Sequence, residues 1–194
     1  MSTKMKLLIA SNNQHKIEEI KEVLRGKFDE ITSLHDEGID CDPEENGQTF
    51  LDNALIKARA IAKFTDKAVL ADDTGLCVNA LNGNPGVHSA RYAGDHNSAA
   101  NRRKLLSELA GSTDHSAYFK TVVVLLYPDG RFLTGEGEVH GRIIEREQGE
   151  NGFGYDSIFY STELDKTFAE ASTEEKLTVS HRTRALRDLL SKLQ

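Results

Sequence analysis

The feature that most constrains the fold is a β-rich run, residues 117–127, that is followed at once by a turn. The run is dense in Val, Leu, Tyr and Phe, and Pro128-Asp129-Gly130 ends it with residues that favour tight turns. Residues 131–140 then supply a second strand of comparable length. This combination predicts a β-hairpin, and therefore a sheet that contains a pair of consecutive strands.

Short apolar strands and periodic helices lie on both sides of this hairpin in the sequence. Strands are predicted over residues 6–10 and 68–71 from their continuous apolar runs. Helices are predicted from their apolar stripes after the polar turn 11–15, from Thr49 onward, over 99–110 and up to residue 193. Because strands and helices do not alternate strictly, the pattern favours an α/β fold with a long mixed β-sheet flanked by helices over a doubly wound sheet.

Length and composition fit one globular domain, residues 1–194, with 38% hydrophobic and 28% charged residues. The net charge of -7 argues against general binding to nucleic acid or to an anionic membrane. No apolar run is long enough for a bilayer span, and the N-terminal apolar run is too short for a signal peptide. Cys41 and Cys77 show no metal-ligand spacing, so we expect reduced thiols in a cytoplasmic protein, with a disulfide as the alternative.

The strongest chemical signal is the acidic segment Asp72-Asp73-Thr74-Gly75, which follows the predicted strand 68–71. Neighbouring side chains on an extended segment point in opposite directions, so one aspartate can face a site while the other orients its surroundings. Mg²⁺ takes one or two carboxylates and completes its shell with water and phosphate oxygens. The alternative is a solvated turn. A second acidic cluster, residues 40–45, precedes a helix, and stabilisation of the positive end of that helix is the favoured explanation when the cluster is taken alone.

Three further segments have the chemistry of nucleotide binding. Residues 11–16 connect a strand to a helix, where backbone N–H groups can hold phosphate, although an asparagine that caps the helix explains them equally well. Residues 149–156 are rich in Gly and aromatic residues, so that Phe153 could stack on a base, whereas Tyr155 is the better candidate for the core. His181 and Arg182 are donors that suit a purine with acceptors at O6 and N7. The commoner case for such residues is a Ser cap followed by two exposed polar residues, and Lys176 is most often a surface lysine.

The order of these motifs resembles the inosine triphosphate pyrophosphatase family, the non-canonical purine NTP pyrophosphatases, from residue 7 to the end. The matching segments are residues 8–16, 45–47, 53–58, 71–76, 80–94, 152–156, 175–176 and 180–182. The resemblance implies an elongated structure of two lobes with a central active-site cleft. It also implies a homodimer that hydrolyses ITP, dITP and XTP to the monophosphate and pyrophosphate.

The resemblance also assigns roles to individual residues. It implies that Asp73 accepts the proton and binds Mg²⁺, and that Glu45 is the second metal ligand. The implied substrate-binding residues are Ser11, Asn12, Asn13, Gln14, His15, Lys16, Lys57, Thr74, Phe153, Gly154, Tyr155, Asp156, Lys176, His181 and Arg182. The chain departs from the family pattern in three places: the family often has Thr-Gly-Asn at residues 11–13, commonly Ser at Thr74, and commonly Pro at Ser157.

These residues suggest in-line attack of water on the α-phosphorus, with Mg²⁺, Lys16 and Lys57 neutralising the triphosphate. Donors in the base pocket would favour a 6-oxo purine over adenine, because an amino group would leave those donors unsatisfied. Two alternatives remain at this stage. One is a Maf-like pyrophosphatase that acts on pyrimidine nucleotides, which the Ser180-His181-Arg182 match argues against. The other is a nucleotide sensor that binds without hydrolysis.

Overall fold

The computed structural model describes residues 3–193, and its strands form one mixed seven-stranded sheet. The strand order is β2-β1-β3-β4-β5-β6-β7. β1 pairs in parallel with β2 and with β3, while β6 pairs antiparallel with β5 and with β7. The predicted mixed sheet with flanking helices is therefore confirmed. The strands are β1 (Thr3–Ile9), β2 (Phe28–Ser33), β3 (Ala68–Val78), β4 (Ser116–Leu126), β5 (Phe132–Ile143), β6 (Phe159–Ser161) and β7 (Lys166–Thr167).

The helices confirm the periodic segments predicted from the sequence and add elements that were not predicted. The α-helices are α1 (Gln14–Val23), α2 (Phe50–Ala62), α3 (Ser98–Leu109), α4 (Thr173–Val179) and α5 (His181–Ser191). Thr49 caps α2 where a helix was predicted to begin, because its hydroxyl accepts a hydrogen bond from Asp52 N–H. The turn-rich stretch near residue 82 contains two 3-10 helices, η1 (Asn79–Leu81) and η2 (Gly86–Arg91). Helix α4 and the strands β2, β6 and β7 were not predicted from the sequence.

The chain separates into two compact units, each made of segments that are distant in sequence. Unit 1 contains the chain up to Asp73, Thr121–Gly137 and the segment from Arg182 onward. Unit 2 contains Thr74–Lys120 and Glu138–His181. The single domain over residues 1–194 and the cleft between two lobes both stay predictions.

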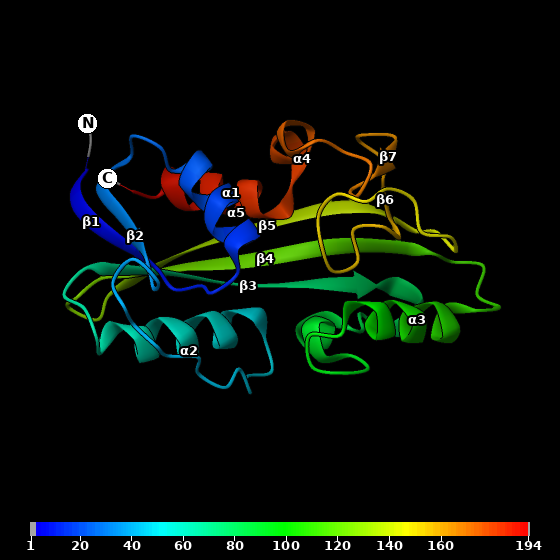
Figure 1. Cartoon of the computed structure of the whole chain (residues 1–194), viewed down its shortest axis with the longest axis horizontal. Coiled ribbons are helices and arrows are strands. Elements are labelled where there is room, and N and C mark those ends of the chain that lie inside the picture. The colour runs from blue at the N-terminus through cyan, green and yellow to red at the C-terminus, as the bar shows by residue number, and fades with distance from the viewer. Residues whose placement is uncertain (1–2, 194) are drawn as a thin grey trace. The chain divides into compact units, whose positions relative to one another are not determined.

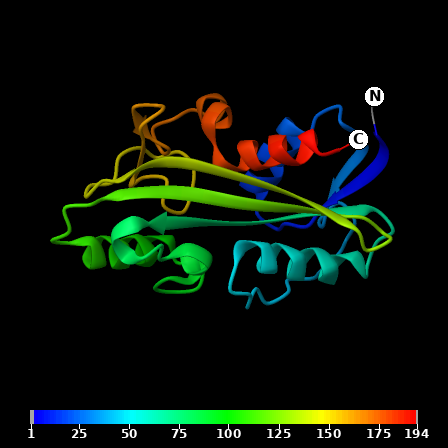
Figure 2. The ribbon, with the colours of Figure 1, turned by 180° about the vertical axis from the view of Figure 1, so that it is seen from behind.

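In unit 1, helices cover both faces of the strands: α1 and α5 lie on one face and α2 on the other (Figures 1 and 2). The alternation of side chains along β3 explains this arrangement. Ala68 and Leu70 pack in the core formed with α1 and α5. Val69 and Ala71 pack in the core formed with α2. β3 is therefore apolar on both faces, which is why its sequence reads as a continuous apolar run.

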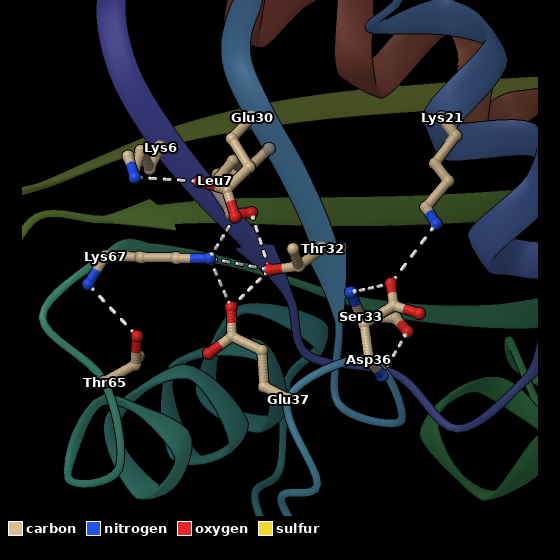
Figure 3. Close-up of polar contacts among 10 residues, drawn as sticks. All are labelled: Lys6, Leu7, Lys21, Glu30, Thr32, Ser33, Asp36, Glu37, Thr65 and Lys67. Carbon is tan, nitrogen blue, oxygen red and sulfur yellow. Dashed lines mark hydrogen bonds and ion pairs between the residues drawn. The ribbon is translucent and has the colours of Figure 1, made fainter.

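Within unit 1, a network of charged side chains attaches the edge strand β2 to its neighbouring segments (Figure 3). Lys67 Nζ lies 2.9 Å from Glu30 Oε1, 2.5 Å from Glu37 Oε1 and 3.2 Å from Thr32 Oγ1. Lys6 Nζ pairs with the second oxygen of Glu30 at 3.0 Å. These contacts connect β2 and the turn that follows it to the beginning of β3.

In unit 2, the core combines aliphatic side chains with a cluster of aromatic rings, and α3 contributes Leu105 and Leu109 to it. Phe119 stacks against Phe168 and meets Phe159 edge to face, with ring centroids 5.9 and 4.7 Å apart. Cys41 of unit 1 and Cys77 of unit 2 are both free thiols in the structure.

Candidate functional site

The acidic segment is part of a buried strand, so the solvated-turn interpretation is wrong. Asp72 and Asp73 lie within β3 and are 1% and 7% exposed. The strand continues past them because Leu76, Cys77 and Val78 supply further buried apolar side chains. Turn-like composition misleads here because hydrogen bonds and ion pairs inside the fold compensate both carboxylates.

The two aspartates face different partners, as the alternation along β3 requires. Asp72 has the same parity as Ala68 and Leu70, and its carboxylate lies 3.1 Å from Lys16 Nζ of α1. Asp73 has the parity of the opposite core, and its Oδ2 accepts a hydrogen bond from Asn53 Nδ2 of α2 at 3.0 Å. The inference that the two carboxylates point in opposite directions is therefore confirmed.

Asp72 is surrounded by cations. Besides Lys16, Arg182 Nε lies 3.7 Å from its Oδ2, and Lys57 Nζ donates to its backbone carbonyl at 2.9 Å. Burial alone would raise the pKa of Asp72, but the charges of Lys16 and Arg182 outweigh it and hold that pKa far below its usual range. Asp72 is therefore a permanent anion that holds two side chains assigned to substrate binding.

Arg182 is deeply buried, which corrects the alternative that it is an exposed polar residue. It is 1% exposed, and its guanidinium pairs with Glu19 of α1, a carboxylate that sequence analysis did not single out. The pairing joins α1 to the beginning of α5 across a long sequence separation. In unit 1 Arg182 thus bridges Glu19 and Asp72, and its assignment to the base edge stays a prediction.

Asp73 has a different electrostatic environment from Asp72. Burial, together with the nearby negative charge of Glu45, raises the pKa of Asp73 to about 6, although the Asn53 hydrogen bond opposes this shift. A carboxylate with such a pKa is suited to accept a proton near neutral pH. Asn53 itself was missed as a site residue because a single polar residue inside an apolar stripe gives no distinctive sequence signal.

Glu45 and Lys57 form the outer part of the same charged cluster. Glu45 Oε1 lies 2.5 Å from Lys57 Nζ, so this glutamate of the acidic segment 40–45 has an ion-pair partner on α2. Burial alone would lower the pKa of Lys57, but Asp72 and Glu45 raise it above its usual value. The pKa of Lys16 is lowered, mainly by burial and despite Asp72.

The donor set around Asp73 fits Mg²⁺. Among residues 3–193 no group of three or more His, Cys, Asp or Glu side chains is arranged to hold a metal ion. Mg²⁺ does not require such a group, because one or two carboxylates suffice when water and phosphate oxygens complete its octahedron. The charge of Glu45 already raises the pKa of Asp73, so a cation shared by these carboxylates would relieve their mutual repulsion.

The loop of residues 11–16 combines a helix cap with a positive charge. Asn13 caps α1 by accepting a hydrogen bond from Lys16 N–H at 3.3 Å, so the capping interpretation is confirmed. Ser11 Oγ accepts one from Asn13 N–H at 3.1 Å. The side chains of Asn12, Gln14 and His15 are exposed at this helix start. Their contacts with a substrate stay predictions.

In unit 2, Lys176 and Asp156 organise the Gly-rich loop 149–156. Lys176 is 7% exposed, so the interpretation as a surface lysine is wrong. Its Nζ lies 3.0 Å from Asp156 Oδ2 and 5.0 Å from the centre of the Phe153 ring. The same Asp156 oxygen accepts a hydrogen bond from Phe153 N–H at 3.0 Å. These contacts fix the backbone on which Phe153 is carried.

The remaining predicted residues of unit 2 are mostly in its core. Tyr155 is 6% exposed and its hydroxyl donates to Ser89 O at 2.6 Å, which confirms its interpretation as a core aromatic. His181 is 4% exposed and stacks on Phe119 with ring centroids 4.8 Å apart, so it is not an exposed polar residue. Thr74 is half-buried and follows Asp73 on β3.

A protein family, curated proteins and solved structures all match this chain along almost its whole length. The Ham1 family model matches residues 7–192. The dITP/XTP pyrophosphatase of Clostridium perfringens is 46% identical over 97% of both chains. That of Treponema denticola is 48% identical over 94% of this chain and 95% of its own. The Ham1 protein of Staphylococcus aureus has a solved structure with a TM-score of 0.86, 44% identity and 96% coverage of each chain.

Proposed function

The chain belongs to the Ham1 family, and from this premise we propose that it hydrolyses dITP, XTP and ITP to the nucleoside monophosphate and pyrophosphate. The observation that carries the proposal is the buried cluster of Asp73 and Asp72 with Lys16 and Lys57. Such a cluster combines a proton acceptor with cations that can neutralise a polyphosphate. The printed names of the relatives, dITP/XTP pyrophosphatase, support the choice of substrate.

In the proposed reaction, the oxygen of water forms a bond to the α-phosphorus, and the bond from that phosphorus to the α,β-bridging oxygen breaks. Asp73 accepts the proton of the water, and Asn53 holds the carboxylate in position. Lys16 and Lys57 neutralise the triphosphate, and the exposed N-terminus of α1 with Ser11–His15 donates to its oxygens. Asp72 pairs with Lys16, and its charge favours the protonated form of both lysines.

Asp73 and Glu45 would hold Mg²⁺ in this site. When bound, the ion supplies charge neutralisation for the phosphate oxygens and lowers the pKa of a coordinated water. Lys57, which pairs with Glu45 in the structure, can then turn to the phosphates, because its four-carbon side chain allows several positions.

For the base, we propose that Phe153 provides the stacking surface and that Lys176, His181 and Arg182 donate to acceptors of the purine. Gly154, Asp156 and Thr74 complete the substrate contacts, and Tyr155 supports them from the core. The orientation of Phe153 through Asp156 and Lys176 supports this role. A 6-oxo purine satisfies these donors and adenine does not, which gives the selectivity a physical basis.

The proposal also covers the oligomeric state of the protein and its location in the cell. We propose a cytoplasmic homodimer that does not bind nucleic acid, in keeping with the net charge of -7. Among the described residues, no helix combines the length and the apolar character needed to cross a membrane.

One assay tests the reaction and its alternatives. The purified protein is incubated with dITP, XTP, ITP, the canonical purine NTPs and pyrimidine NTPs, with and without Mg²⁺, and pyrophosphate and orthophosphate are measured separately. We expect pyrophosphate from the non-canonical purines only when Mg²⁺ is present. Preferred pyrimidine hydrolysis would support a Maf-like enzyme, binding without turnover would support a sensor, and release of orthophosphate would contradict the proposed bond cleavage.

A further inference from the structure

Within unit 2, three side chains form a network across the Gly-rich loop. Arg102 of α3 donates through Nη1 to the backbone carbonyl of Gly154 at 2.7 Å. Its Nε lies 2.5 Å from Glu147 Oε1. The same glutamate oxygen accepts a hydrogen bond from Ser157 Oγ at 2.7 Å. The network therefore connects the residues before, inside and after the loop that carries Phe153.

The loop needs such support because its glycines give the backbone a wide range of accessible conformations. Gly149, Gly152 and Gly154 all have positive φ angles, of 91°, 75° and 61°. Glycine loses more conformational entropy on ordering than any other residue, so the ordered loop must be stabilised by contacts elsewhere. Arg102 can supply one, because α3 is fixed in the core by Leu105 and Leu109, which are 0% and 2% exposed.

Ser157 extends this network to the end of the loop. Its hydroxyl donates to Glu147, and its backbone carbonyl accepts a hydrogen bond from Gln148 N–H at 2.9 Å. Two noncovalent contacts thus restrain the end of the loop.

We propose that Arg102 is a positioning residue for base recognition, and that the Arg102–Glu147–Ser157 network restrains the loop that carries Phe153. Arg102 acts through the Gly154 carbonyl, which lies between Phe153 and the core residue Tyr155. The inference rests on the proposed function insofar as the loop binds the base. A second attachment, Tyr155 to Ser89, does not involve Arg102, so loss of Arg102 loosens the loop without unfolding unit 2.

The test uses steady-state kinetics of the full-length protein with dITP and XTP. We expect Arg102→Ala to raise KM about five- to tenfold while kcat stays within about twofold, as for the loss of one charge-assisted hydrogen bond that positions a binding group. Glu147→Ala should change KM in the same direction and by less. Arg103→Ala is the matched control, because Arg103 is the exposed neighbour on the same helix, and it should leave both constants unchanged.

The double variant Arg102→Ala/Ser157→Pro makes the test specific. If Arg102→Ala raises KM by loosening the loop, a proline at position 157, which fixes φ at the end of the loop, should reverse most of that increase in KM, which a purely structural role of Arg102 does not predict. Failure of the double variant to recover KM, with a melting temperature equal to that of Arg102→Ala, would overturn the proposal.

Hydrogen exchange of the ligand-free protein separates this inference from the proposed function. Backbone amides of residues 149–158 should exchange faster in Arg102→Ala than in Arg103→Ala, and should regain protection in the double variant. Unchanged exchange in Arg102→Ala would contradict the positioning role whatever the activity. A wild-type protein without activity on any purine triphosphate would refute the proposed function, and the exchange result would still decide whether the network restrains the loop.

Discussion

The side-chain amide of Asn53 donates to Asp73 Oδ2 at 3.0 Å while its own oxygen accepts a hydrogen bond from Gly47 N–H at 2.8 Å. Asn53 is 1% exposed, and a Cβ at Gly47 would lie 2.7 Å from the same amide oxygen, so the loop and the side chain fit closely. Asn53 therefore couples the loop that carries Glu45 to the carboxylate proposed as proton acceptor.

Asn53→Asp should lower kcat roughly 10- to 100-fold, because the substitution replaces a donor with a second carboxylate beside Asp73. The size of the side chain hardly changes, so the effect should come from hydrogen bonding and charge. Kinetics at saturating dITP measure it. Asn46→Asp, at an exposed position of the same loop, is the control, and an equal loss in that variant would count against the specific role of Asn53.

Neutralising the two adjacent aspartates should change stability in opposite directions. Asp73→Asn should abolish turnover and raise the free energy of unfolding at pH 7 by about 1–3 kcal/mol in metal-free buffer, because a buried carboxylate with a pKa of about 6 is costly to ionise. Asp72→Asn should lower the free energy of unfolding by about 3 kcal/mol or more, because Lys16 and Arg182 lose their common partner.

The pH dependence of the Asp73→Asn effect follows from the sign of the shift. Because the pKa of Asp73 is raised in the folded state, its unfavourable ionisation is complete above about pH 6 and absent below the unfolded value of about 3.8. The advantage of Asp73→Asn over the wild type should therefore disappear as the pH falls from 7 to 4. Denaturant unfolding at both pH values measures this, and a gain that persists at pH 4 would show another cause.

Alanine substitutions at Gly152 and at Gly154, in the Gly-rich loop 149–156, should raise KM to different extents. A Cβ at Gly152 would lie 2.2 Å from Asp156 Oδ2, the oxygen that holds Lys176, whereas a Cβ at Gly154 would meet no atom within 4 Å. Both positions have positive φ, so both alanine variants should lose about 1 kcal/mol from backbone strain. Gly152→Ala should in addition raise KM for dITP more than Gly154→Ala does, and equal KM values would contradict the importance of Asp156.

Lys67→Met should lower the melting temperature at pH 7, because the lysine holds Glu30 and Glu37 at edge strand β2 (Figure 3). Its hydrogen bond lowers the pKa of Glu30, and it lowers that of Glu37 despite the opposing effect of burial. Glutamates with depressed folded pKa values stabilise the protein above their unfolded pKa, and this contribution is lost on acidification. The difference from wild type should therefore shrink below about pH 4. Lys63→Met, at an exposed position nearby, is the control.

Much of the fold could be predicted because most elements have a strong local signal. The hairpin around residue 129 and the helices with regular apolar stripes are of this kind. Strand β2 could not be predicted, because an edge strand stabilised by charged side chains is polar on much of its surface. Helix α4 had a signal that was overlooked, the capping box in which Ser172 and Glu175 bond to each other's backbone N–H.

For the candidate site, the sequence predicted which side chains carry the chemistry, but it did not predict their ion-pair partners or their burial. The opposite directions of Asp72 and Asp73 follow from strand geometry alone. The pairing of Glu19 with Arg182 does not, because the two residues are far apart in sequence and each looks like an ordinary helix charge. The burial of Lys176 and His181 could likewise not be predicted, because it depends on how segments distant in sequence pack around them.

Because Asp72 and Asp73 project from opposite faces of β3, a shift of the strand by one residue would move every side chain to the other face. Inserting or deleting one residue between Ala68 and Asp72 would direct each carboxylate toward the partners of the other and exchange the two apolar faces as well. A substitution in this strand therefore affects one face at a time, whereas a change in its length affects both faces at once, so its length is under strict constraint.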